Sequence, residues 1–123
     1  MDCVFCKIIK GEIPSSNIYE DDNVFVFLDI SPQSKGHTLV IPKQHFENIF
    51  EIPETILIDV MRIVKATSLH LKEKLHCEGL NIKQNNGELA GQTVNHLHFH
   101  LIPQYSEEKE YDLEELFNIL KIV

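Results

Sequence analysis

The sequence is short of cations and cysteines, and it has no tryptophan and no long apolar run. Its 11 Lys and Arg stand against 19 Asp and Glu, which gives a formal net charge of −8 at pH 7. Proteins that track a nucleic-acid backbone gain affinity by neutralising phosphates with cations, so we expect no nucleic-acid partner. A small phosphate compound is not excluded, because a local pocket can override the net charge.

Other absences bear on the compartment. No apolar run approaches the roughly 18 residues that a membrane span needs, so we expect no membrane partner. The N-terminus carries Asp2 and no apolar stretch of signal-peptide length, which predicts a cytoplasmic location. Three cysteines are an odd number, and no disulfide framework is expected in a reducing compartment. Cys77 stands alone and is expected to be a small apolar filler.

What the sequence does contain is enough apolar material for one core, with 43% hydrophobic and 24% charged residues in 123. This predicts a single domain over residues 1–123. The patterns predict helices at 3–9, about 53–76 (with Gly79 just past its end) and 112–120, and strands at 17–20, 24–28, 37–41, 80–84 and 95–102. The expected fold is α+β, an antiparallel sheet of about five strands with one long helix packed across it.

The most informative stretch runs from His96 to Leu101, where histidine alternates with an apolar residue. On a strand the three imidazoles project from one face and the apolar side chains enter the core beneath the long helix. Three interpretations follow. In the first, the face is solvated and has no function. In the second, the imidazoles converge on a metal. In the third, one imidazole acts as a phosphorus nucleophile and its neighbours act as hydrogen-bond donors.

The loop before this strand favours phosphoryl chemistry. Residues 85–93 are polar and contain two glycines, which let backbone N–H groups approach an anion closely. Gln92 and Thr93 add side-chain donors. Alone such a loop is unremarkable, but beside the histidines it resembles the edge of a phosphate pocket.

Together these motifs resemble the histidine triad (HIT) superfamily. The resemblance runs in order through residues 3–9, 27–32, 37–42, 91–94 and 96–102, from Cys3 to about Gln104, and leaves about 106–123 outside. It is closest to the nucleoside-phosphoramidate hydrolase branch in its bacterial-type, zinc-carrying form. The resemblance implies a HIT-like two-layer α+β protomer that pairs into a homodimer with a continuous sheet. An exposed sheet edge and an apolar long helix also favour a second copy.

The resemblance further implies a hydrolase or transferase acting on the α-phosphate of AMP or GMP conjugates through a nucleotidyl-histidine intermediate. In that scheme His98 is the nucleophile, His100 and His37 hold phosphate oxygens, and Thr93 joins His98 and His100 as a catalytic residue. Asp29 accepts the ribose hydroxyls. The other implied nucleotide-binding residues are Asn85, Gly91, Gln92 and Thr93 around the phosphates, and Phe5, Ile8, Phe27 and Ile30 around the base.

Cys3 and Cys6, at C-x-x-C spacing on a predicted helix, supply half of a zinc site, with His45 and His96 as candidates for the other half. The resemblance implies that these four form a closed Cys₂His₂ site, so that the zinc is structural and His96 is no catalytic base. The alternative is two reduced cysteines without a metal.

Other functions remain open from the sequence. They are a dinucleoside polyphosphate hydrolase, a metallohydrolase with the three triad histidines as ligands, and a non-catalytic nucleotide sensor. One departure from the family pattern also matters: Gln104 stands where bacterial relatives often carry arginine.

Overall fold

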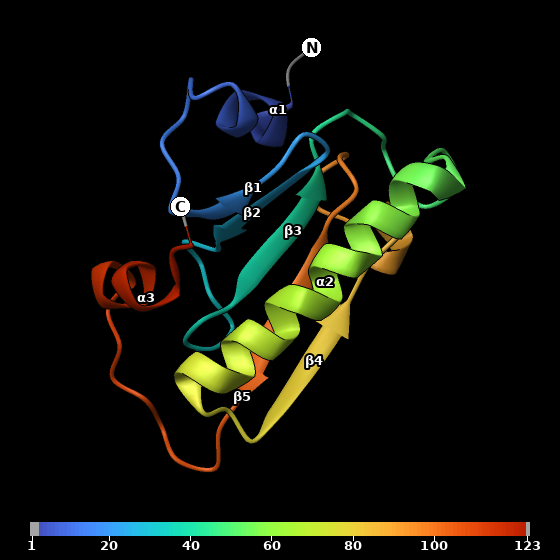
Figure 1. Cartoon of the computed structure of the whole chain (residues 1–123). Coiled ribbons are helices and arrows are strands. Elements are labelled where there is room, and N and C mark those ends of the chain that lie inside the picture. The colour runs from blue at the N-terminus through green and yellow to red at the C-terminus, as the bar shows by residue number, and fades with distance from the viewer. Residues whose placement is uncertain (1–2, 123) are drawn as a thin grey trace.

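Five strands form one antiparallel sheet in the order β1-β2-β3-β5-β4 (Figure 1). In this computed structural model, which describes residues 3–122, the strands are β1 Asn17–Glu20, β2 Val24–Leu28, β3 Thr38–Pro42, β4 Gly79–Lys83 and β5 Phe99–Gln104. The helices are α1 Val4–Ile9, α2 Glu54–Leu75, α3 Leu113–Leu120 and a 3₁₀ turn, η1, at Glu88–Ala90. The expected α+β class, with one long helix against a five-stranded sheet, is confirmed.

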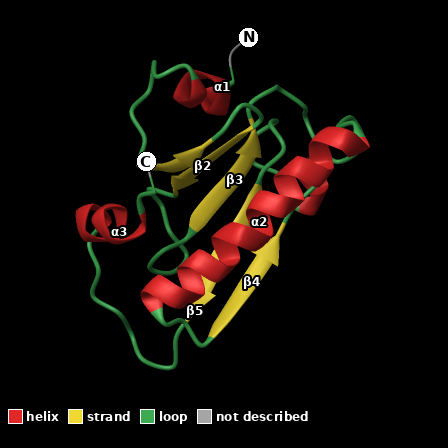
Figure 2. Ribbon diagram, viewed as in Figure 1, coloured by secondary structure: helices red, strands yellow, loops and turns green. Residues whose placement is uncertain are grey.

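The long helix α2 lies across one face of the sheet (Figure 2). Its apolar residues recur every three or four positions, which puts Val60, Val64 and Leu71 on one side. They pack against Leu97 and Leu101 of the histidine stretch, and all five side chains are buried in the main core. The apolar residues between the histidines therefore enter the core as expected, and the imidazoles are left on the other face.

Helix α2 ends at Leu75, close to the predicted end at about 76, and Gly79 lies beyond it. The residue that turns the chain out of the helix is His76, whose φ of 53° is left-handed. The N–H of His76 still bonds the carbonyl of Lys72 at 3.0 Å, so the last turn is closed before the chain turns. Gly79 is the first residue of β4.

The opposite face of the sheet has a second, smaller core under α1. Phe5 of α1 packs there with Phe25 and Phe27 of β2 and with Leu39 and Ile41 of β3. Because helices cover both faces at this point, every residue of β2 and β3 is buried.

The strand expected to carry all three histidines contains only His100 among them. It begins at Phe99, not at residue 95, so the prediction of a strand from 95 to 102 was wrong at its start. The N–H of Leu97 bonds the carbonyl of Phe46 at 2.7 Å, and the ring of His96 bonds the carbonyl of Pro42 at 2.8 Å. These partners replace a strand ladder, to which Pro42 could donate no hydrogen bond in any case.

The two edges of the sheet are covered differently. Beside β1, the N–H of Ile122 bonds the carbonyl of Ile18 at 2.8 Å, so the C-terminal segment covers part of that edge. Strand β4 forms the other edge, and four of its five residues are exposed. Among residues 3–122, no helix has both the length and the apolar character that crossing a bilayer requires.

Candidate active site and metal centre

A cavity of about 360 Å³ opens between α1, the end of β2 and the histidines. The predicted site residues that line it are Phe5, Ile8, Phe27, Asp29, Ile30, Thr93, His98 and His100. The lining is mostly apolar at the α1 side, where the ring of Phe5 meets those of Phe27 and His98 edge-on at 5.5 and 5.2 Å between centroids. This wall suits a flat, apolar ring, with polar groups gathered at one end.

The sequence interpretation missed part of this lining. Val4, Leu39 and Val94 also face the cavity, as do Ser31 and the segment Ile13–Ser15. Residues Ile13–Ser15 belong to the connection between α1 and β1, and no local sequence pattern marks such a connection as part of a cavity wall.

A hydrogen bond fixes which ring nitrogen of His98, a residue of the cavity wall, carries the hydrogen. Its Nδ1 lies 2.8 Å from the carbonyl oxygen of His96, and a carbonyl can only accept, so Nδ1 carries the hydrogen. In the neutral ring the lone pair is then on Nε2. Burial is the main cause that lowers the pKa of His98, which favours the neutral imidazole. The arrangement supplies a nucleophilic nitrogen that needs no deprotonation.

A second chain of hydrogen bonds sets the protons of His37 and His100. The backbone N–H of Gln33 donates to Nδ1 of His37 at 3.1 Å, so the hydrogen of His37 is on Nε2. That Nε2 lies 3.0 Å from Nδ1 of His100, which must accept. The hydrogen of neutral His100 is therefore on Nε2, where it can donate to a ligand oxygen. Burial lowers the pKa of both rings, that of His100 to about 4.

Asp29 stands at the end of β2 beside this pair. Its Oδ1 accepts from the N–H of Ser31 at 2.8 Å, and its Oδ2 lies 3.6 Å from Nε2 of His37. Asp29, His37 and His100 bring donor atoms within 4.8 Å of one another, close enough for a metal. Nε2 of His37 and Nδ1 of His100 already share a hydrogen bond, however. The Asp29 carboxylate is therefore better suited to accept hydrogen bonds from hydroxyl groups than to bind a metal together with these rings.

The loop from 85 to 93 divides into residues that reach the cavity and residues that build the loop. Thr93 lines the cavity. The amide of Gln92 is buried and fully used, since Nε2 donates to the carbonyls of Glu47 and Val94 while Oε1 accepts from the N–H of Gly87. Gln92 thus fixes the loop and does not offer its amide to a ligand.

The other two predicted site residues of this loop, Asn85 and Gly91, do not line the cavity but are joined to each other. Nδ2 of Asn85 donates to the carbonyl of Gly91 at 3.3 Å. Gly91 has a φ of +94°, a conformation that residues with a side chain seldom adopt.

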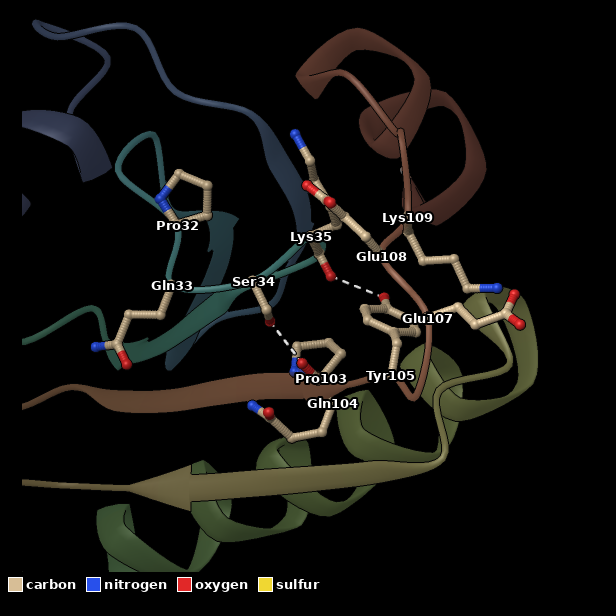
Figure 3. A pocket seen from close by; sticks show the side chains of 10 residues that line it. All are labelled: Pro32, Gln33, Ser34, Lys35, Pro103, Gln104, Tyr105, Glu107, Glu108 and Lys109. Carbon is tan, nitrogen blue, oxygen red and sulfur yellow. Dashed lines mark hydrogen bonds between the residues drawn. The ribbon is translucent and has the colours of Figure 1, made fainter.

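The loop from 31 to 36, which carries the Gln33 amide, is braced against the far end of β5. The hydroxyl of Ser34 donates to the carbonyl of Pro103 at 2.6 Å, and that of Tyr105 donates to the carbonyl of Lys35 at 2.8 Å (Figure 3). These residues border a separate cavity of about 340 Å³ that no triad histidine lines. The braces hold the backbone that sets the proton of His37.

A second cluster lies behind the histidines. Cys3, Cys6, His45 and His96 bring one donor atom each to within 4.8 Å of one another. The carbonyl of Pro42 accepts from Nε2–H of His96, so the lone pair of neutral His96 is on Nδ1, which points at the sulfurs. Burial lowers the pKa of His96 to about 4 and favours this neutral form.

The spacing of these donors fits a tetrahedral metal. Around zinc, with bonds of about 2.3 Å to S and about 2.0–2.1 Å to N, an S and an N ligand lie about 3.6 Å apart and two N ligands about 3.3 Å. Nδ1 of His96 is 3.4 Å from Sγ of Cys3 and 3.6 Å from Sγ of Cys6. Nδ1 of His45 is 3.4 Å from Sγ of Cys6 and 3.2 Å from Nδ1 of His96. The four residues expected from the sequence could therefore hold a metal.

The same distances test whether His96, His98 and His100 could bind one metal ion together. Among residues 3–122, the two metal-sized groups are the cysteine–histidine cluster and the group of Asp29, His37 and His100. His96 belongs to the first, His100 to the second, and His98 to neither. The three rings thus do not converge on one point, and the interpretation as a triad metal site has no geometric support.

Comparison with known proteins agrees with these features. A model of the family described as HIT domain matches residues 10–107. A HIT-like protein of Methanocaldococcus jannaschii is 49% identical, over 97% of this chain and 98% of its own. An adenosine 5′-monophosphoramidase of Candida albicans is 46% identical (85% and 72% covered). An adenylylsulfatase of Arabidopsis thaliana is 38% identical (94% and 58%).

A solved structure with a similar fold is also similar in sequence. A zinc-bound histidine triad family protein of Mycobacterium smegmatis superposes with a TM-score of 0.90 at 37% identity, over 98% of this chain and 91% of that one.

Proposed function

Because the chain belongs to the HIT domain family, we propose that this hydrolase cleaves the α-phosphate bond of nucleoside monophosphate conjugates through a covalent bond to His98. The observation that carries the proposal is the state of His98. Its Nδ1–H is bound to the carbonyl of His96, and the ring forms part of the cavity wall. A neutral imidazole held in one tautomer is a competent phosphorus nucleophile near pH 7.

In the first step, the lone pair on Nε2 of His98 attacks the α-phosphorus and the bond to the leaving group breaks. Nε2–H of His100 donates to a non-bridging oxygen, where negative charge concentrates in the transition state. His37 acts through His100, because it donates to Nδ1 and so keeps the hydrogen of His100 on the ligand side. In the second step, water attacks the phosphorus, the P–N bond breaks and the nucleoside monophosphate is released.

The rest of the cavity suits a purine nucleotide. The wall formed by Phe5, Ile8, Phe27 and Ile30 takes the base, and Asp29 accepts the ribose hydroxyls. Thr93 stands at the phosphate end, with Gly91 and Asn85 shaping the loop behind it. Adenine and guanine conjugates both fit this description.

The names of the relatives support the adenylyl part of the substrate. A monophosphoramidase and an adenylylsulfatase share the adenylyl group and differ in what leaves it. This comparison favours a cavity that recognises the nucleotide. Residues outside the cavity would then contact the leaving group. A dinucleoside polyphosphate would be a further member of the same class.

We also propose that Cys3, Cys6, His45 and His96 hold a structural zinc. With four protein ligands the ion has no open position, so it stabilises and does not activate water. It would join the start of α1 to the histidine stretch, and it would fix His96, whose carbonyl holds His98.

The proposed partner is a second copy of this chain. Strand β4 is an open edge, and the exposed side chains of Ile82 on β4 and Leu69 on α2, at 51% and 58% exposure, are apolar area that a second copy would cover. The other edge is already occupied in part by Ile122.

The covalent intermediate is the direct test. The enzyme is mixed with an adenylyl phosphoramidate labelled at the α-phosphorus, quenched within milliseconds and digested for mass analysis of the peptide that contains His98. We expect an acid-labile, base-stable adenylyl group on His98 and none in His98→Ala. Turnover that a chelator abolishes, with no label trapped at any time, would contradict the proposal. Tight nucleotide binding without turnover of any conjugate would support the sensor instead.

A further inference from the structure

Lys83, the last residue of β4, lies directly opposite His100. Strand β4 lies beside β5 (Figure 1), and the register of this pair places Lys83 opposite His100. Residues directly opposite in an antiparallel pair project from the same face, with Cβ atoms about 4.5–5.5 Å apart. Its neighbour Ile82 is opposite Leu101, which enters the core under α2. The side chain of Lys83 therefore stands on the histidine face of the sheet.

No ion pair among the described residues neutralises this cation. Within residues 3–122, the ion pairs of the structure join His37 to Asp29, Lys43 to Glu20 and Arg62 to Asp59, and Lys83 takes part in none. Lys83 is exposed. Its charge contributes to the lowered pKa of both His37 and His100, as expected for an ammonium that acts on both rings.

Lys83 is the cationic residue on the histidine face of β4 and β5. On the histidine face, β4 contributes Gly79, Asn81 and Lys83, while β5 contributes His100, Ile102 and Gln104. Gln104, at the far end of the face, is neutral. An anion beside His100 would therefore meet Lys83 first.

We propose that Lys83 binds the leaving group of the substrate and selects nucleotide conjugates whose leaving group is an anion, such as a sulfate, phosphate or carboxylate. This inference rests on the proposed function and adds the chemical class of the leaving group. The cavity wall of Phe5 and Phe27 holds the nucleoside end, and Lys83 stands on the opposite side of His100, beyond the histidines.

The chemistry of departure explains the selection. As Nε2 of His98 forms the P–N bond, the P–O bond breaks and its electron pair leaves with the oxygen of the departing group. A sulfate, phosphate or carboxylate leaves as an anion without taking a proton, and an ammonium beside it stabilises the developing charge. An amine must instead gain a proton before it leaves, and Lys83 in its ammonium form repels the resulting cation.

The experiment compares two adenylyl substrates that differ only in the leaving group. These are adenosine 5′-phosphosulfate, which releases an anion, and adenosine 5′-phosphoromorpholidate, which releases an amine. Lys83→Met removes the charge, Lys83→Arg keeps it, and Lys65→Met on the far side of α2 is the control for net charge. We expect Lys83→Met to lower kcat/KM for the phosphosulfate about fivefold to tenfold, with the morpholidate unchanged or faster. Lys83→Arg and Lys65→Met should stay near the parent values.

A binding measurement separates this inference from the proposed function. The dissociation constants of α,β-methylene-ADP and of AMP are measured by calorimetry for the parent protein and Lys83→Met. Selective weakening of the methylene compound supports the anion site even if no substrate turns over, which would overturn only the proposed function. Equal effects on both substrates and on both ligands, or no effect on either pair, would overturn the role of Lys83 and leave the proposed function standing.

Discussion

The carbonyl oxygen of His96 accepts the Nδ1–H of His98 at 2.8 Å, while the Nδ1 atom of the same His96 lies 3.4 Å from the sulfur of Cys3. His96 thus belongs to the metal-sized cluster through its ring, and its backbone carbonyl holds His98, which lines the cavity. A change in either the cluster or His98 therefore has to be tested for effects on the other.

Replacing His98 by alanine should abolish turnover and spare binding. The substitution removes the attacking nitrogen but leaves Asp29, Phe5 and Phe27 in the cavity wall. We expect kcat to fall by about 10³ or more, with the dissociation constant of AMP within about threefold of the parent. Steady-state kinetics and calorimetry check the two values. Residual activity near the parent level would show that another group attacks the phosphorus.

Replacing both Cys3 and Cys6 by serine should remove the metal and destabilise the fold. The loss of a cross-link between α1 and the histidine stretch should cost about 3 kcal/mol or more, roughly 10 °C in Tm. Atomic emission measures the zinc, and calorimetry measures Tm. Cys77→Ser is the control, since Cys77 is also buried but belongs to no metal-sized group among residues 3–122. Stoichiometric zinc in the double variant would refute the ligand assignment.

Stability should fall in mild acid because of His100. Burial, with the neighbouring positive charges, lowers its pKa in the folded chain from 6.5 to about 4. Between these values the unfolded chain binds more protons, so the free energy of unfolding decreases as pH falls from 6.5 toward 4. Above pH 6.5 this effect is absent. Its slope should stay below the limit of about 1.4 kcal/mol per pH unit for one group.

Urea unfolding at several pH values tests this dependence. His100→Asn should show a shallower loss of stability with acid than the parent protein. His76→Asn is the matched control, because His76 is exposed and asparagine accepts its left-handed backbone. Identical acid profiles for the parent and His100→Asn would contradict the prediction.

A charge placed on the open sheet edge should prevent self-association. Ile82→Lys puts an ammonium beside β4, where we propose that a second copy binds. Sedimentation velocity at micromolar concentration should show a dimer for the parent and a monomer for this variant. Ile122→Lys adds the same charge at a residue of similar exposure, 56%, near the covered edge, and should stay dimeric. A monomeric parent protein would exclude the homodimer.

Gly36→Ala should destabilise the chain more than Gly11→Ala. Both glycines have positive φ, +91° and +79°, so alanine strains the backbone at either position by about 1 kcal/mol. At Gly36 a Cβ would also lie 2.5 Å from Cδ1 of Leu75, whereas at Gly11 no atom of residues 3–122 would lie within 4 Å of it. Urea unfolding should therefore give Gly36→Ala a further loss of about 1–3 kcal/mol. Equal losses would show that Leu75 yields without cost.

Periodicity predicted most of the fold because local pattern and tertiary packing agree here. The alternation from His96 to Leu101 identified both the core face and the histidine face, although regular strand begins only at Phe99. The late start depends on contacts with Pro42 and Phe46, which lie about 50 residues earlier and which no local pattern reports. The donor atoms of the metal cluster were predicted through resemblance, and the structure brings all four together.

Other features of the site could not be read from the sequence. The tautomers of His37, His98 and His100 depend on single backbone groups whose positions are set by folding. The full use of the Gln92 amide depends on Glu47, which is distant in sequence. The position of Lys83 opposite His100 follows from strand register, which a hairpin turn would fix but a long connection does not.

The bonds from Ser34 to Pro103 and from Tyr105 to Lys35 tie the loop from 31 to 36 to the end of the sheet before any ligand arrives, and Ser31 of this loop lines the cavity beside the histidines. This loop loses its conformational entropy during folding and is already ordered when a nucleotide binds. Little of the binding free energy is therefore needed to order the loop. Association should accordingly proceed in one kinetic phase, with a rate proportional to ligand concentration and no slow isomerisation afterwards.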